Sequence, residues 1–174
     1  TAKNGTKPWR NTGYKFPVTI VTGDLQYKGF NNNLIVRGNA VYGNLGASGA
    51  LTTINNSSSA ASGYPNTTVA QNAVSYGGEA GYNIGSFFHS KAPRIYPFIR
   101  YEYYNPMEKT EANTGLLADK RFQVSAVTAG LNYYALPNLV IKADYTHRSI
   151  GGGKYNDENL VSVGIAYIGW FIKK

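Results

Sequence analysis

The 174-residue chain has no cysteine, a single methionine and no hydrophobic run of membrane-spanning length. Without cysteine it cannot be a secreted domain held together by disulfides. Without a stretch of about 18–20 apolar residues it has no candidate transmembrane helix. Strands that alternate apolar and polar residues average to nearly neutral hydropathy. The mean hydropathy of −0.31 therefore leaves a membrane-spanning β protein open.

Charge of one sign is also scarce, with 9 Asp and Glu against 17 Lys and Arg, a net charge of +8. Much of the basic surplus lies near the N-terminus, at expected short turns and at the C-terminus, rather than within expected strands. No basic stripe interleaved with aromatic residues is found. Nucleic-acid binding, whose electrostatic footprint is such a stripe or patch, is therefore disfavoured.

Glycine (20) and tyrosine (15) are abundant, and period-two alternation recurs along the chain. In the stretch LVIKADYTHR, 139–148, the odd positions begin Leu, Ile, Ala, Tyr, and the even positions from 142 on are Lys, Asp, Thr and Arg. Helical periodicity is nowhere convincing, so we predict an all-β fold. The seven predicted strands are 15–27, 34–44, 73–87, 94–104, 122–134, 139–148 and 159–171.

Short and long connections alternate between these strands. The short turns are 28–33, 88–93 and 135–138, and the long loops are 45–72, 105–121 and 149–158. This alternation is typical of outer-membrane barrels, which have short periplasmic turns and long extracellular loops. The first long loop is a low-complexity segment rich in Ser, Thr, Asn, Ala and Gly, and we expect it to be mobile and solvated.

The two sides of the predicted strands differ in chemistry. One side holds Val, Ile, Leu, Ala and Tyr, with aromatic residues near strand ends, as suits a membrane interface. A soluble β-sandwich would explain the alternation, but neither the loop asymmetry nor the Gly-rich polar side. We therefore predict an antiparallel transmembrane β-barrel, an up-and-down meander. Its candidate pore-lining residues, four of each sign, are Asp24, Arg37, Glu79, Arg100, Glu102, Lys142, Asp144 and Arg148.

Turn geometry predicts the register of the first hairpin. If Tyr27 pairs with Leu34, Asp24 lies across from Arg37 and both face the lumen. Such charges would set a field across a channel and tune which ions pass. The alternative is that they solvate the lumen wall or brace a plugged barrel.

The same reasoning applies to the second hairpin. If Phe87 pairs with Arg94, Glu79 falls opposite Glu102 and Arg100 lies diagonal to Glu79. Neighbouring opposite charges in a wet lumen contribute a few tenths to about 1 kcal/mol each.

Seven strands do not close an ordinary bacterial barrel, whose strand count is even. The chain starts at Thr1, without an initiator Met or a signal peptide, so we expect a processed protein or a fragment. With a periplasmic C-terminus, residues 1–14 would lie outside the cell as a loop or tail. The single predicted domain, 1–174, is then the C-terminal part of a larger barrel.

Four strand motifs carry a family resemblance: YGGEAGYNIG (76–85), YPFIRYEYYNP (96–106), VTAGLNYYALPNLVIKADYTHR (127–148) and VSVGIAYIGWF (161–171). Together they resemble the C-terminal strands of outer-membrane porins from Bacteroidota-type bacteria, over residues 73–171. More distantly, the chain is similar to phosphate-selective porins. The resemblance implies a passive channel in the outer membrane.

We therefore expect a porin, a passive diffusion channel for small hydrophilic solutes or ions in the outer membrane of a Gram-negative bacterium. The alternative is a non-conducting barrel that acts as a structural anchor or an adhesin through its long loops. Expected partners are outer-membrane lipid, the solutes, and further copies of the chain or other outer-membrane proteins, but no nucleic acid.

We expect no enzymatic activity, no cofactor and no metal. The two histidines, His89 and His147, lie at opposite ends of the predicted barrel, so they cannot share a metal ion or a substrate. The glycines at 151–153 precede no helix and do not form a phosphate cradle. The acidic run 156–158 favours a solvated loop over a calcium site, which needs about six converging oxygens.

Overall fold

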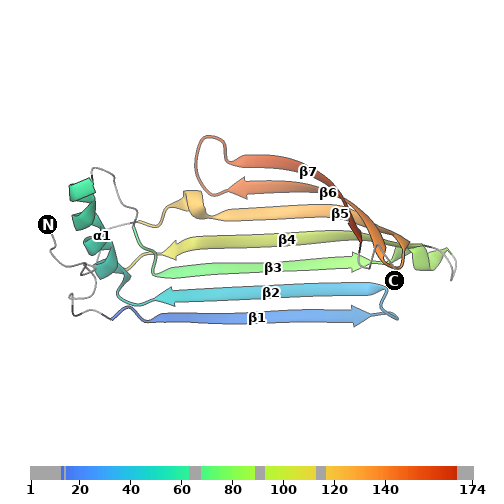
Figure 1. Cartoon of the computed structure of the whole chain (residues 1–174), viewed down its shortest axis with the longest axis horizontal. Coiled ribbons are helices and arrows are strands. Elements are labelled where there is room, and N and C mark those ends of the chain that lie inside the picture. The colour runs from blue at the N-terminus through green and yellow to red at the C-terminus, as the bar shows by residue number, and fades with distance from the viewer. Residues whose placement is uncertain (1–12, 14, 63–67, 89–92, 113–116, 168–174) are drawn as a thin grey trace, which may run out of the picture.

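The computed structural model of the chain describes residues 13, 15–62, 68–88, 93–112 and 117–167. They form one seven-stranded antiparallel sheet in which the strands follow each other in chain order (Figure 1). This confirms the all-β meander predicted from the alternation. The strands are β1 (Val18–Gly29), β2 (Leu34–Leu45), β3 (Asn72–Tyr82), β4 (Arg94–Lys109), β5 (Val124–Leu136), β6 (Leu139–Ile150) and β7 (Asp157–Tyr167).

The sheet is a single layer with two edges, β1 and β7 (Figure 1). Within the described part of the chain, no pairing joins these two strands. Few side chains are enclosed, and the apolar ones among them are Tyr96, Met107 and Val124. The described residues thus have no core of the kind that two packed layers would create.

Helical segments that interrupt the meander in the described part of the chain include α1 (Ser48–Ser62) and two 3₁₀ turns, η2 (Ile84–Phe87) and η4 (Lys120–Phe122). None of the described helices combines the length and the hydropathy needed to cross a membrane. In Figure 1, α1 lies at the end of the sheet where β2 leads into β3, and the β4–β5 and β6–β7 connections lie at the same end. We call this the long-loop end and the other the short-turn end.

The first short turn is tight. Phe30, Asn31 and Asn32 have positive φ angles of 50°, 55° and 65°, and the N–H of Asn33 donates to the carbonyl of Phe30 at 3.1 Å. Asparagine tolerates this left-handed region better than most residues, which explains the asparagines at 31 and 32.

The second short turn begins earlier than predicted because β3 ends at Tyr82 rather than at residue 87. Asn83 breaks the strand. Its side-chain amide donates to Asn33 Oδ1 at 3.0 Å, and its Oδ1 accepts from the N–H of Ile95 at 3.1 Å. Asn83 therefore ties the two neighbouring short turns together and is itself 7% exposed.

The prediction of a mobile, solvated segment at 45–72 is wrong over residues 48–62, which form α1. The Glu111 carboxylate holds the start of this helix, accepting from the N–H of Gly49 at 2.5 Å and from the Ser48 hydroxyl at 3.5 Å. A carboxylate at a helix N-terminus satisfies free N–H groups and complements the helix dipole.

The other side of the same segment is fixed by Thr52. Its hydroxyl donates to the carbonyl of Ser48 at 3.0 Å and accepts from the N–H of Val69 at 2.9 Å. Ser48 is completely buried, and Thr52 is 2% exposed. The beginning of α1 is therefore packed against the structure.

The other long loops are shorter than predicted. β4 runs on to Lys109, and β7 starts at Asp157, so the described residues 110–112, 117–119 and 151–156 lie between strands. Most of the predicted tail 1–14 and the end of the last predicted strand, 168–171, lie outside the described residues, as do 63–67, 89–92 and 113–116.

Candidate functional site

The eight residues singled out from the sequence all lie on one face of the sheet, which we call the polar face. Antiparallel partners share a face, and the pairing runs from Asp24 to Asn39 and on to Gly77, Glu102 and, through β5, Arg148. The neighbouring rows contain Arg37, Glu79, Arg100, Asp144 and Lys142.

The predicted register of the first hairpin is wrong. Tyr27 pairs with Val36, so Asp24 lies opposite Asn39 rather than Arg37. β1 continues two residues further than predicted, to Gly29, while β2 starts at Leu34 as predicted, so the turn closes over the four residues 30–33. Because the shift equals two residues, every side chain keeps its predicted face.

The predicted register of the second hairpin is wrong by the same amount. Glu79 lies directly opposite Arg100, whereas Glu102 lies opposite Gly77. The cause is the early end of β3 at Tyr82, which places the following residues in the turn instead of the ladder. The predicted pair of like charges is thus replaced by a pair of opposite charges.

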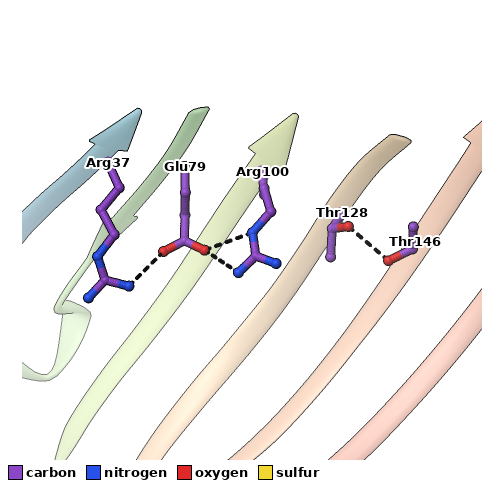
Figure 2. A network of polar contacts seen from close by, with 5 residues as sticks. All are labelled: Arg37, Glu79, Arg100, Thr128 and Thr146. Carbon is purple, nitrogen blue, oxygen red and sulfur yellow. Dashed lines mark hydrogen bonds and ion pairs between the residues drawn. The ribbon is translucent and has the colours of Figure 1, made fainter. Parts of the chain in front are cut away.

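Glu79 lies between two arginines from neighbouring strands, as Figure 2 shows. On one side, Nη1 of Arg37 lies 3.4 Å from Oε1 of Glu79. On the other, Nε and Nη2 of Arg100 donate to Oε2 at 2.9 and 2.5 Å. The Glu79 side chain is 18% exposed, against 57% for Arg37 and 41% for Arg100. One partly buried carboxylate therefore neutralises part of the charge of two more exposed guanidinium groups.

Sequence reasoning missed the contact between Arg37 and Glu79. These residues pair across β2 and β3, which are joined by the segment that contains α1. A connection of that length sets no register, so only the hairpins with short turns could be aligned from the sequence.

The same row continues across the sheet with two threonines. The hydroxyls of Thr128 on β5 and Thr146 on β6 lie 2.8 Å apart, and Thr128 is 6% exposed (Figure 2). The hydroxyl pair extends the row of polar contacts from β2 to β6.

Arg148 forms a second group of contacts nearer the long-loop end. Its Nη1 donates to Glu158 at 2.9 Å, and its Nη2 donates to the Tyr104 hydroxyl at 3.0 Å. Glu158 was missed because it falls in the predicted loop 149–158. It lies directly opposite Arg148 in β7, and only that pairing could have identified it.

Four of the eight residues, Asp24, Glu102, Lys142 and Asp144, form no ion pair with another described residue. Asp24 and Glu102 line a hollow of about 500 Å³ together with Arg37, Glu79 and Arg100. Its floor contains glycine. At Gly77, an added Cβ would approach the carbonyl of Tyr101 to 3.1 Å, so a larger residue would press on the strand and fill the hollow.

The described residues contain no group of three or more side chains suited to binding a metal ion. His147 lies on the opposite, apolar face, where its Nδ1 is 3.0 Å from Oδ1 of Asn159, which also accepts from the Tyr145 hydroxyl at 2.7 Å. His89 lies outside the described residues. The polar face offers fixed charges and hydroxyl groups, which are suited to attracting and orienting solutes.

No protein-family model, curated protein or solved structure matches this chain.

Proposed function

We propose that this chain forms the wall of an outer-membrane β-barrel porin, a passive diffusion channel for small hydrophilic solutes or ions. In this arrangement the apolar face of the sheet contacts lipid and the polar face lines the lumen. Further strands complete the barrel between β1 and β7. The site for the solute is the polar face, with the hollow beside Glu79 as its most concave part.

The observation that carries the proposal is the exposure of the apolar face. Val161, Val163 and Ile165 are 73, 76 and 72% exposed, and Leu25 and Ile99 are 66 and 58% exposed. Burying one such side chain stabilises a protein by about 1.5–3 kcal/mol. A continuous apolar face of this kind marks contact with a membrane or a partner.

Aromatic side chains on the apolar face support a lipid contact. Tyr76 stacks on Tyr103, with ring centroids 4.9 Å apart, nearer the long-loop end of β3. At the short-turn end, Tyr82 stacks on Phe87 at 5.4 Å and lies 6.5 Å from the ring of Phe30. Six residues of a strand, from 76 to 82, span about 20 Å. Two aromatic groups at roughly this separation fit the girdles that flank an apolar band about 25 Å tall.

The distribution of charge supports a wet lumen. The ion pairs on the sheet, Arg37–Glu79, Arg100–Glu79 and Arg148–Glu158, belong to the polar face. The arginines in them are 39–57% exposed, which suits contact with water better than a dry core. In a soluble sandwich, one of these two unlike faces would have to pack against another layer.

One feature favours the second candidate, a non-conducting barrel that anchors or displays its loops. The long-loop end is organised: Glu111 and Thr52 fix the start of α1, which could present a rigid surface to a partner. The two functions differ in whether the lumen is open.

The experiment is to reconstitute the purified full-length protein in planar bilayers and to record single-channel currents. A porin gives reproducible conductance steps. Two controls accompany the recording. The protein should stay with the membrane until detergent extracts it, which reports insertion, and it should give a β-rich circular dichroism spectrum, which reports folding. A folded, inserted protein that gives no steps would contradict the porin and favour the anchor. A protein that is stable and monomeric in water without detergent would contradict both membrane functions.

A further inference from the structure

We propose that the charges of the polar face are ordered along the strands, so that the channel rectifies: it passes more current in one direction than in the other. This inference rests on the proposed porin function and goes beyond it, because a uniformly charged lumen would also conduct. It concerns how the sign of the fixed charge changes along the passage, from the short-turn end toward the long-loop end.

The ordering is the same on each strand of the polar face that carries both signs. On the polar face of β1, β4 and β6, the charged residue nearest the short-turn end is basic. An acidic residue follows it on the same strand toward the long-loop end. The three pairs, basic residue first, are Lys28 and Asp24, Arg94 and Glu102, and Lys142 and Asp144. Because each comparison is made within one strand, the tilt of the strands in a barrel does not alter the order.

The charges that depart from this order are paired. Arg148 lies beyond Asp144 toward the long-loop end, but Glu158 faces it at 2.9 Å. Arg37 and Arg100 share Glu79, which leaves one net positive charge, and their row follows the order because it lies on the short-turn side of Asp24 and Glu102. Charges that are compensated at short range contribute little to the field further away.

What remains is segregated between rows of the sheet: Asp24 and Glu102 share one row nearer the long-loop end, whereas Asp144 shares a row with Lys28. Asp24, Glu102 and Asp144 make no ion pair with another described residue, and they lie in the middle of their strands. Lys28 and Lys142 likewise make none and lie nearer the short-turn end, where Arg94 stacks on Tyr134 with its guanidinium carbon 4.8 Å from the ring centroid. A stacked guanidinium group keeps its full charge.

The spacing is large enough to matter at low salt. Lys28 and Asp24 are four residues apart, a rise of about 13 Å along the strand. The Debye length is about 10 Å at 0.1 M salt and about 3 Å at 1 M. The Lys28–Asp24 spacing exceeds both lengths, and at low salt the fields of these charges extend into the passage. Lys142 and Asp144, two residues apart on β6, are only about 7 Å apart along the strand and partly compensate each other at low salt.

The acidic zone, Asp24 and Glu102, and the basic zone nearer the short-turn end fix the direction of rectification. The acidic zone concentrates cations and the basic zone concentrates anions. When the long-loop side is positive, cations enter through the acidic zone while anions enter through the basic zone, so both accumulate between them and the current rises. The opposite polarity empties this region of ions and lowers the current.

The test is a current–voltage curve of the full-length protein inserted in a known orientation. These 174 residues contain no cysteine, so Asn156→Cys on the β6–β7 connection adds a single thiol among them, and its labelling by a membrane-impermeant thiol reagent, compared with the wild type, reports which side the long-loop end faces. We expect a roughly twofold larger current at about 0.1 M salt when the long-loop side is positive, and nearly equal currents at about 1 M.

Matched variants show which charges cause the rectification. Asp24→Asn with Glu102→Gln removes the two acidic charges that share a row, and Lys28→Gln with Lys142→Gln removes two of the basic charges near the short-turn end. Each double variant should bring the current ratio closer to one. Asp157→Asn, which removes a charge at the start of β7 off the polar face, should leave the ratio unchanged.

Symmetric currents from the oriented protein at low salt would overturn the inference while leaving the porin intact, and so would a ratio that both double variants preserve. Absence of any conductance from folded, inserted protein would overturn the porin, and the ordered lumen with it. The lysine variants keep the test usable if the acidic variants do not fold.

Discussion

Glu79 and Arg100 lie directly opposite each other on β3 and β4, and Arg100 donates to a single carboxylate oxygen through both Nε and Nη2. Arg37 contacts the other oxygen of the same carboxylate from β2. One acidic residue thus holds two guanidinium groups that would otherwise repel each other across the strands.

Glu79→Gln should free both arginines and shift the selectivity of the channel toward anions. The reason is that one negative charge is lost where two positive charges remain, on the wall of the hollow. The measurement is the reversal potential under a salt gradient, compared with that of the wild type. Asp157→Asn removes the same charge away from the hollow and should leave the potential unchanged. An unchanged potential in Glu79→Gln would show that this row does not face the ion path.

Glu111→Gln should loosen the start of α1. The variant keeps the size of the side chain but removes the negative charge that accepts from the N–H of Gly49 and complements the helix dipole. The loss should be about 0.5–2 kcal/mol of local stability. Amide hydrogen exchange over residues 49–56 should accelerate, while exchange in β1 stays as it is. Equal exchange in variant and wild type would contradict the role given to Glu111.

Asn83→Ala should destabilise the whole short-turn end. It removes the acceptor for the N–H of Ile95 and the donor to Asn33, and leaves their polar atoms without these partners. Such a loss costs about 1–3 kcal/mol. Urea-induced unfolding in detergent micelles measures it. Asn156→Ala, at an exposed position in the β6–β7 connection, serves as the matched substitution and should change the midpoint little.

Asp119 should titrate at lower pH than an ordinary aspartate. Hydrogen bonds from the Arg121 side chain, and then from its backbone N–H, lower the pKa of the Asp119 carboxyl group. A carboxyl whose pKa is depressed by folding stabilises the fold above its unfolded pKa, and this stability is lost as the pH falls through the lower, folded value. This contribution to stability is therefore lost below about pH 4.

Arg121→Gln supplies the comparison for that titration. Without the guanidinium group, the NMR-monitored pKa of Asp119 should rise toward that of an unpaired aspartate. Because both side chains lie at the surface, overall stability should hardly respond. Identical titration curves in the two proteins would contradict the proposed contact.

The alternation of side chains predicted the order of the strands and the shared face of the eight candidate residues, since a period of two is fixed by the backbone. It could not predict the register of the strands, which depends on the residue at which each strand ends and its turn begins. Asn83, for example, ends β3 through bonds to Asn33 and Ile95, which belong to other parts of the chain. A shift of two residues then decides whether Glu79 faces Glu102 or Arg100.

The helix α1 was not predicted either, because it also depends on a contact with a residue distant in sequence. Its sequence, SGALTTINNSSSAAS, has neither an acidic first turn nor a strong apolar stripe. The negative charge that stabilises its start comes from Glu111, some sixty residues later. Local propensity is a weak guide where the decisive partner is distant in sequence.

The two free edges of the sheet bear on how the proposed porin would enter a membrane. β1 and β7 each carry peptide N–H and C=O groups that no described neighbour satisfies. In hydrocarbon, each such group costs several kcal/mol, whereas in water it costs little. For the proposed porin, edge pairing and entry into lipid must therefore occur together. A sheet that entered the bilayer with open edges would be driven back out, and one that lingered in water would present its edges to other molecules.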